Sequence, residues 1–341
     1  MIDFSQLPVP VVQAPMAGGV SRPALVQAVA EAGGLGFLAG GYLRAEALRD
    51  QIDAVRGRVD GPFGVNLFVP EPPRTEVDLR AYRQRLQPVA ERYGVTVPEP
   101  NWADDDFFGE KVEMLLEERI PAVSFTFGMP EPKVIEAFRA GGSTVIVTVT
   151  TAEEARAAVN AGADALCVQG PEAGGHRSTH RMTDEPGRTS LVELLRDIRV
   201  GIPVIAAGGM TTGADIAAAL AAGATAVQLG TAFLRSDESG AKQPHKDALA
   251  DPRFTDTAVT RAFTGRPARA LRTTFVESFD DAAPAVYPQL HQLTAPIRAA
   301  AAAAGEADNL ALWAGTGYRH VRTGPAADIV EELWRQAVRL R

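Results

Sequence analysis

The chain has 341 residues, of which 46% are apolar and 22% are charged, a composition typical of soluble globular proteins. Its net charge of −8 and the absence of a tract rich in Lys and Arg argue against a nucleic-acid or membrane partner. There is no apolar run of about 20 residues, no signal-peptide pattern and only one cysteine, Cys167, so we expect a cytoplasmic protein without an intramolecular disulfide.

Eight short apolar segments along the chain predict buried strands. They lie at residues 10–16, 35–41, 63–68, 122–128, 144–150, 165–170, 203–209 and 226–231. Their nearly continuous apolar character indicates a parallel sheet that is buried on both faces. Eight units within residues 10–231 favour a closed (β/α)8 TIM barrel over an open doubly wound sheet. An open sheet would require an early Gly-x-Gly-x-x-Gly turn, which AGGVSR at 17–22 matches only weakly.

Segments with helical spacing separate these strands. They lie at 24–33, 45–57, 108–120, 132–141, 152–162, 190–199 and 213–223, and several end in Gly, as helix C-termini often do. Two regions fall outside the repeat: a Pro-rich insertion at 70–106, after the third strand, and a mostly helical C-terminal extension at 235–341. We therefore predict a barrel domain at 1–234 with both regions packed against it, the insertion on the rim that carries the site.

Active sites of such barrels lie at the carboxyl ends of the strands, so only these ends need inspection. They contain no pair of carboxylates for glycoside chemistry and no lysine for a Schiff base. Cys167 lies inside an apolar strand, which favours a buried structural thiol over a nucleophile. His176 and His180 are four residues apart but lack a third ligand, so we expect no metal site.

The strand ends are instead rich in glycine and in amide side chains. Gly208 and Gly209 after the seventh strand, and Gly230 and Thr231 after the eighth, occupy positions where barrels commonly bind phosphate. The amides of Asn66, Gln169 and Gln228 could pair with the polar edge of a flavin. The alternative interpretation is that these glycines only close tight turns between strands and helices.

Six motifs occur in order along the barrel: QAPMAGG from 13, NLF at 66–68, SFTFG at 124–128, CVQGPEAGGHR at 167–177, PVIAAGGM at 203–210 and AVQLGTAFL at 226–234. Together they resemble the nitronate monooxygenases, formerly called 2-nitropropane dioxygenases. The resemblance implies a TIM barrel that binds FMN non-covalently, without a metal or NAD(P)H. It implies that the contacts to FMN are made by Met16, Asn66, Gln169, Gly174, Gly175, Gly209, Gln228, Leu229, Gly230 and Thr231.

The resemblance also implies a reaction, in which an alkyl nitronate and O2 give a carbonyl compound and nitrite. The late motif WAGTG at 313–317 is similar to an element of class I of the family, for which propionate 3-nitronate is the implied substrate. His176 matches the histidine beside the flavin, either as a base or as a partner for the anion's charge. Thr126, where some relatives have His, and Tyr318, after WAGTG, are departures that concern the substrate more than the flavin.

Other functions share parts of this pattern. An FMN-dependent enoyl-acyl-carrier-protein reductase has the same barrel and the AGGH element, and an NADH:quinone reductase is related. A flavin-binding barrel without catalytic activity is a third alternative. The sequence leaves the oligomeric state undecided.

Overall fold

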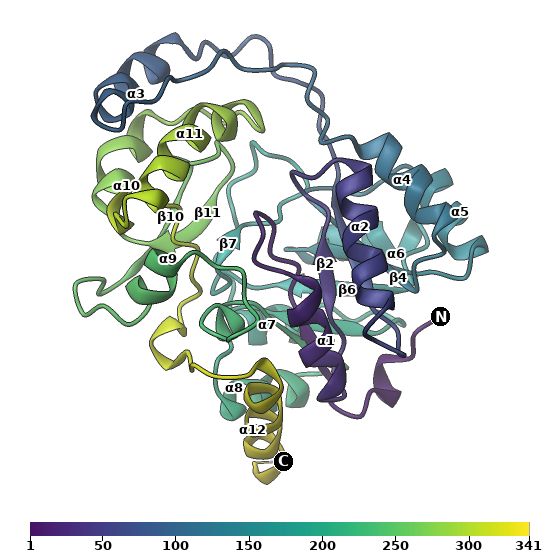
Figure 1. Cartoon of the computed structure of the whole chain (residues 1–341). Coiled ribbons are helices and arrows are strands. Elements are labelled where there is room, and N and C mark those ends of the chain that lie inside the picture. Colours follow the sequence, from purple (N-terminus) through teal and green to yellow (C-terminus); the bar gives the residue numbers. More distant parts are fainter. Residues whose placement is uncertain (341) are drawn as a thin grey trace.

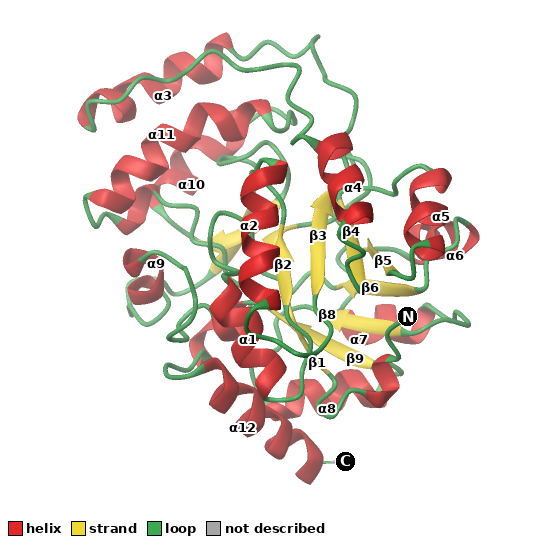
Figure 2. Ribbon diagram, turned by 45° about the vertical axis from the view of Figure 1, so that its right-hand side comes forward, coloured by secondary structure: helices red, strands yellow, loops and turns green. Residues whose placement is uncertain are grey.

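A computed structural model describes residues 1–340 of the chain, and its centre is a closed barrel of parallel strands. The strand order is β1-β9-β8-β6-β5-β4-β3-β2, and a parallel bridge from Val12 to Leu35 joins the two ends of this sheet. The barrel strands are β1 (Val11–Gln13), β2 (Phe37–Ala39), β3 (Gly64–Phe68), β4 (Ala122–Thr126), β5 (Thr144–Val149), β6 (Ala165–Gln169), β8 (Val204–Ala207) and β9 (Ala226–Leu229). The predicted TIM barrel is confirmed (Figures 1 and 2).

Each expected strand lies within its predicted segment, but several end earlier than predicted. β1, for example, stops at Gln13 although the apolar run continues to Met16. The side chain of Gln13 donates to Ser21 Oγ and accepts from the backbone N–H of Phe37. These bonds hold Gln13 at the end of the strand, and the residues that follow it form a loop. The residues beyond the strand end are therefore free to line a site.

Helices surround the barrel strands (Figure 2). Those between successive strands are α1 (Pro23–Glu31), α2 (Ala45–Arg56), α4 (Phe108–Glu117), α5 (Pro132–Ala140), α6 (Ala152–Asn160), α7 (Leu191–Asp197) and α8 (Gly213–Ala221). Capping boxes begin α7 at Ser190 and α8 at Thr212, and the Thr151 side chain caps α6. Local sequence thus fixes where these helices start.

One further helix completes the ring of helices around the barrel, and it comes from the C-terminal end of the chain. Helix α12 (Ala326–Arg339) packs against α1 and α8, and it buries Ile329, Leu333 and Ala337 in the apolar layer between strands and helices. The C-terminal extension, predicted over 235–341, therefore begins outside the barrel and returns to it.

The insertion and the rest of the extension form a lobe beside the carboxyl ends of the strands (Figure 1). Its elements are α3 (Arg80–Arg92), α9 (Gln243–Ala248), α10 (Thr274–Phe279), α11 (Gln289–Ala303) and a three-stranded antiparallel sheet of β10 (Thr257–Thr260), β11 (Ala268–Leu271) and β7 (Gly175–His176). Leu86 of α3 shares a core with Phe263, Phe275 and Leu290. The insertion is thus packed on the extension, and the domain boundary at 234 stays a prediction.

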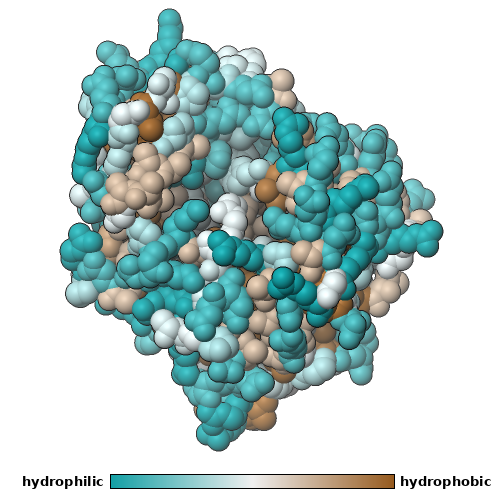
Figure 3. Space-filling view, in the orientation of Figure 1, coloured by the Kyte–Doolittle hydropathy of each residue, from teal (hydrophilic) through white to brown (hydrophobic). Residues whose placement is uncertain are grey.

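The face of the molecule seen in Figure 3 is largely hydrophilic. Within residues 1–340, no helix combines the length and the apolar character that crossing a membrane requires.

Candidate active site

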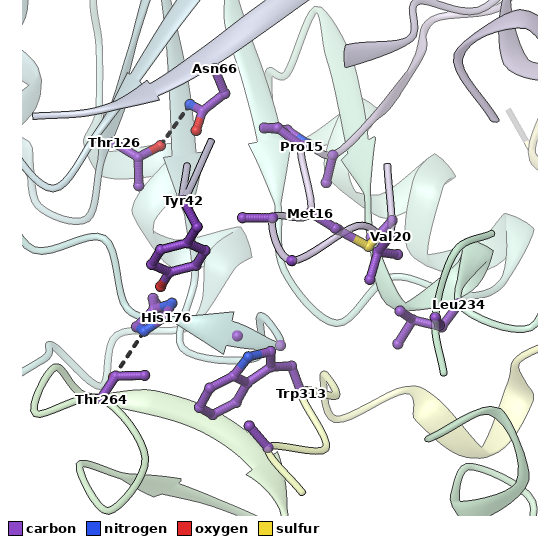
Figure 4. Close-up of a pocket in the computed structure, with 18 of the residues that line it drawn as sticks. Pro15, Met16, Val20, Tyr42, Asn66, Thr126, His176, Leu234, Thr264 and Trp313 are labelled. Carbon is purple, nitrogen blue, oxygen red and sulfur yellow. Dashed lines mark hydrogen bonds between the residues drawn. The ribbon is translucent and has the colours of Figure 1, made fainter. Parts of the chain in front are cut away.

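A cavity of about 520 Å³ lies between the barrel and the lobe, at the carboxyl ends of the strands. The space-filling view shows the surface hollowed there (Figure 3), and Figure 4 shows part of the lining. The volume is in the range of small-molecule and cofactor sites. Nine of the predicted site residues line this cavity: Met16, Asn66, Gln169, Gly174, Gly175, His176, Gln228, Gly230 and Thr231.

His176 reaches the cavity from a paired segment of backbone. The Gly-rich loop after β6 forms strand β7, and His176 pairs with Ala268 of β11. Its Nε2 lies 2.9 Å from the hydroxyl of Thr264 (Figure 4), and that hydroxyl donates to the carbonyl of Arg266. The hydroxyl therefore accepts from Nε2–H, which leaves Nδ1 with a lone pair and no partner among the described residues.

The imidazole of His176 is neutral. Burial lowers its pKa to about 3, and the positive charges of Arg266 and Arg298 act in the same direction. A neutral ring accepts a proton but offers no charge to an anion. Of the two roles that the sequence left open, these surroundings favour the base.

Aromatic rings enclose His176. The rings of Phe127 and Trp313 each lie with their centroids 5.3 Å from the imidazole, and Tyr287 lies at 6.0 Å. The hydroxyl of Tyr42 points toward His176 (Figure 4) and accepts a hydrogen bond from Tyr287. These rings surround the imidazole on the sides that do not face the cavity lining.

These aromatic residues were not predicted to belong to the site, although two of them directly follow strand ends. Tyr42 comes after Gly40-Gly41 and Phe127 after Thr126. Both adopt left-handed backbone conformations, with φ of 68° and 75°, which are uncommon for non-glycine residues and occur often at functional sites. Trp313 is the first residue of WAGTG, a motif that was noted only as a family element.

The amide of Gln169 is occupied by the loop that carries His176. Its Nε2 donates to the carbonyl of His176 and to Ser178 Oγ, and its Oε1 accepts from the backbone N–H of Ser178. Gln169 therefore positions His176, and its contact with a cofactor stays a prediction.

Asn66 and Gln228 each have amide atoms without a partner among the described residues. Asn66 Nδ2 donates to Ser124 and to the hydroxyl of Thr126 (Figure 4), but its Oδ1 has no donor among the described residues. The Gln228 side chain lines the cavity and makes no hydrogen bond within the described chain. The two can offer an acceptor and further polar atoms to the edge of a planar ring.

The predicted phosphate-binding residues separate into two groups. Gly230 and Thr231 line the cavity, whereas Gly208 and Gly209 do not. A Cβ on Gly209 would lie 2.7 Å from Thr316 Oγ1 and 2.7 Å from the Cβ of Glu172, so this glycine is required by the close packing of the WAGTG segment. Gly315 of that segment donates its N–H to the hydroxyl of Thr231 at 3.0 Å.

Leu229 also lies outside the cavity. Its side chain is 1% exposed and packs in the layer between strands and helices. Any contact between Leu229 and a cofactor would have to come through its backbone.

Helix α11 supplies one wall of the cavity. His291, Ala295, Arg298, Ala299 and Ala302 line it from one face of the helix, at the spacing of successive turns. The His291 ring stacks on Tyr42 with centroids 4.2 Å apart. The sequence predicted this helix only as part of the C-terminal extension, because no motif near it in the chain links it to the barrel.

The two histidines considered as a metal pair point to different partners. The Nε2 of His176 is bonded to Thr264, whereas the Nε2 of His180 lies 2.9 Å from the carbonyl of Thr148. Residues 1–340 contain no group of three or more His, Cys, Asp or Glu side chains that could hold a metal ion. Burial raises the pKa of the Cys167 thiol to about 12, so it stays protonated.

Comparisons with known proteins agree on one family. The profile described as nitronate monooxygenase matches residues 1–336. A probable nitronate monooxygenase from Staphylococcus saprophyticus is 39% identical over 340 residues, which cover 96% of this chain and 94% of that protein. The solved structure of nitroalkane oxidase from Streptomyces ansochromogenes is 50% identical with a TM-score of 0.95, covering 98% of both chains. FabK from Thermotoga maritima is 29% identical with a TM-score of 0.77, over 99% of this chain and 96% of that one.

Proposed function

The chain belongs to the nitronate monooxygenase family and is a flavin-dependent oxidoreductase that oxidises nitronates or nitroalkanes. From this premise we propose that it uses FMN and O2 to convert an alkyl nitronate, propionate 3-nitronate, into a carbonyl compound and nitrite. The observation that carries the proposal is the cavity at the strand ends, in which Asn66 Oδ1 and the Gln228 amide have no partner among the described residues and His176 lies on the same lining.

The cavity residues fit FMN in their chemistry. Asn66 Oδ1 can accept from the ring N–H of a flavin, and Gln228 can pair with its carbonyl edge. Backbone N–H groups at Gly174, Gly175 and Gly230, with the Thr231 hydroxyl, suit the phosphate. When bound, FMN supplies the electron transfer between the substrate and O2.

The protein side chains handle the proton and exclude water. A nitroalkane must lose its α-proton before oxidation, and His176 Nδ1 is the base for that step. Thr264 fixes the tautomer of His176, and Gln169 anchors the backbone on which it sits. A nitronate has already lost this proton, so its oxidation does not need the base.

One experiment tests the cofactor and the reaction together. The cofactor is released by heat and identified, and the holoenzyme is assayed for O2 uptake and nitrite release with propionate 3-nitronate. FMN with stoichiometric nitrite is the expected result. Another cofactor, or no O2 uptake with any nitronate, would overturn the proposal.

A second candidate is NAD(P)H-dependent reduction, the activity of the enoyl-acyl-carrier-protein reductases that the AGGH element also resembles. The discriminating test is to mix the holoenzyme with NADH or NADPH without oxygen and to follow the flavin absorbance. Rapid bleaching would favour a reductase, whereas bleaching by propionate 3-nitronate alone supports the nitronate reaction. A flavin-binding barrel without catalytic activity predicts no bleaching with either compound.

A further inference from the structure

A neutral His176 leaves the negative charge of a substrate without a partner at that position. Two basic side chains other than histidine line the cavity, Arg298 and Lys242, and within residues 1–340 no Asp or Glu lines it. Arg298 lies on the face of α11 that forms the cavity wall, close enough that its charge lowers the pKa of His176. The cavity thus contains a fixed cation near the base.

Contacts within α11 orient the Arg298 guanidinium. Its Nε donates to Thr294 Oγ1 at 3.2 Å, and its Nη2 donates to the Nδ1 of His291 at 3.1 Å and to the His291 carbonyl at 3.2 Å. The Thr294 hydroxyl in turn donates to the carbonyl of Phe263, which anchors the helix to the lobe. Three of the five N–H groups are therefore used, and all three belong to Nε and Nη2.

Nη1 is free to bind a ligand. It has no acceptor among the described residues, and no carboxylate of residues 1–340 pairs with Arg298. Arg298 is half-buried at the cavity wall, and a guanidinium with a free N–H edge and no counter-ion attracts an anion that can complete its hydrogen bonds. The arrangement indicates that the anion comes from the ligand.

His291 adds a second donor to the same cavity. Because its Nδ1 accepts from Arg298, a neutral His291 carries its proton on Nε2, which has no partner among the described residues. Burial, Arg298 and His176 all lower the pKa of His291 well below its usual value, so the ring stays neutral. Its stacking on Tyr42 fixes the ring plane.

We propose that Arg298 Nη1 and His291 Nε2–H bind a carboxylate on the substrate, so that the site selects nitronates with a second anionic group. This inference rests on the proposed function and deepens it, because it names the residues that distinguish propionate 3-nitronate from a simple alkyl nitronate. Arg298 meets the charge, and His176 remains neutral beside the reacting carbon.

The kinetic test compares two substrates that differ only at the far end. Propionate 3-nitronate carries a carboxylate where propyl 1-nitronate carries a methyl group. For Arg298→Gln we expect kcat/KM to fall about 100-fold for propionate 3-nitronate and less than about 3-fold for propyl 1-nitronate. Arg298→Lys should recover part of the loss, because it restores the charge without the fixed geometry.

Lys242→Gln is the matched control, because Lys242 is the other basic side chain besides histidine that lines the same cavity. The ratio of kcat/KM for the two substrates should stay at the wild-type value. Equal losses on both substrates in Arg298→Gln, or a selective loss only in Lys242→Gln, would overturn the assignment.

A binding measurement separates this inference from the proposed reaction. Succinate and butyrate are titrated into the resting holoenzyme by calorimetry, with one carboxylate standing in for the nitronate group. The wild type should bind succinate more tightly than butyrate, and Arg298→Gln should lose that preference while its flavin colour and unfolding transition persist. An unchanged preference in Arg298→Gln refutes the carboxylate site, even if no nitronate is oxidised. Absence of nitronate oxidation by the wild type refutes only the proposed function.

Discussion

His176 is a base whose surroundings keep it unprotonated. Its pKa of about 3 lies far below the reference value of about 6.5, chiefly because the ring is buried and secondly because Arg266 and Arg298 are nearby. The alternative that His176 is partly protonated at neutral pH, and so pairs its positive charge with the anionic substrate, therefore does not apply here. The position of His176 was predictable from the AGGH element, but its charge state was not.

A His176→Gln variant should distinguish proton removal from oxidation. We expect it to keep FMN and to oxidise nitronates within a few-fold of the wild-type rate, while its activity on the neutral nitroalkane falls about 100-fold or more. Since His176 is already in its base form above about pH 4, the wild-type rate on nitroalkane should show no loss from this group between pH 8 and pH 6. Stopped-flow and steady-state assays with both substrate forms provide the measurement, and equal effects on the two forms would refute the base assignment.

Gly230 offers a direct test of the phosphate site. Its φ of −115° suits any residue, and an added Cβ would meet its nearest neighbours at 3.4 and 3.6 Å, in ordinary contact. Gly230→Ala should therefore keep the flavin colour, whereas Gly230→Asp should give colourless protein because its carboxylate repels the phosphate. Flavin content per protein is the readout, and yellow Gly230→Asp protein would locate the phosphate elsewhere. Gly209 is unsuitable for this test, because any side chain there clashes with Glu172 and Thr316.

At the scale of the elements, helix α12 shows how a distant segment completes the barrel. Its apolar residues recur at helical spacing, and Figure 2 shows it near α1 and α8. From the sequence, this segment was predicted only as part of the mostly helical C-terminal extension that packs against the barrel. Its partners are about 100 residues or more earlier in the chain, and periodicity carries no information about which surface an amphipathic helix covers.

Truncation of Leu333 should measure the contribution of α12. Leu333 is 1% exposed within the layer that α12 shares with α1 and α8, so Leu333→Ala should lower the free energy of unfolding by about 2–5 kcal/mol. Val338 on the same helix is 51% exposed, and Val338→Ala should change the free energy of unfolding by no more than about 0.5 kcal/mol. Denaturant unfolding followed by circular dichroism decides the matter, and similar effects of the two variants would contradict the packing described.

At the scale of the whole molecule, residues of both the lobe and the barrel line the cavity, and Figure 1 shows the lobe beside the barrel. Three of the five histidines, His176, His245 and His291, line this cavity, and all three have lowered pKa values. The principal cause for each is burial. Burial of these three histidines on folding therefore makes the free energy of unfolding depend on pH.

Acidification should destabilise the protein between about pH 6.5 and pH 4. The pKa of His245 falls from 6.5 to about 4 on folding, so the unfolded chain binds more protons in this window. Stability is then complete above pH 6.5 and decreases as the pH falls, by about 1.4 kcal/mol per pH unit for each such histidine. Unfolding transitions at pH 7, 6 and 5 provide the measurement. A His245→Gln variant should have a shallower pH dependence than the wild type, and identical slopes would show that His245 does not contribute.

Local patterns in the sequence predicted most of the fold. Continuous apolar runs predicted the eight barrel strands, because strands buried on both faces need apolar side chains throughout. The same patterns located the insertion after β3 and the helical extension, since neither fits the strand–helix repeat. The loop carrying His176 was not recognised as strand β7, because its two residues pair with β11 some 90 residues later.

The sequence by itself determined the barrel, the family motifs and the set of strand-end residues that face a common edge, because each depends on neighbours within a few residues. Only the tertiary structure decided which of them reach the cavity. Asn66 reaches it with an unpartnered Oδ1 and Gln228 with an unpartnered amide, whereas Gln169 is already hydrogen-bonded to the His176 loop and Leu229 is buried outside the cavity. It also brought Arg298 into the same cavity as His176. Side chains from separate elements meet through packing, and both burial and neighbouring charge, which set the protonation of His176, arise only from that meeting.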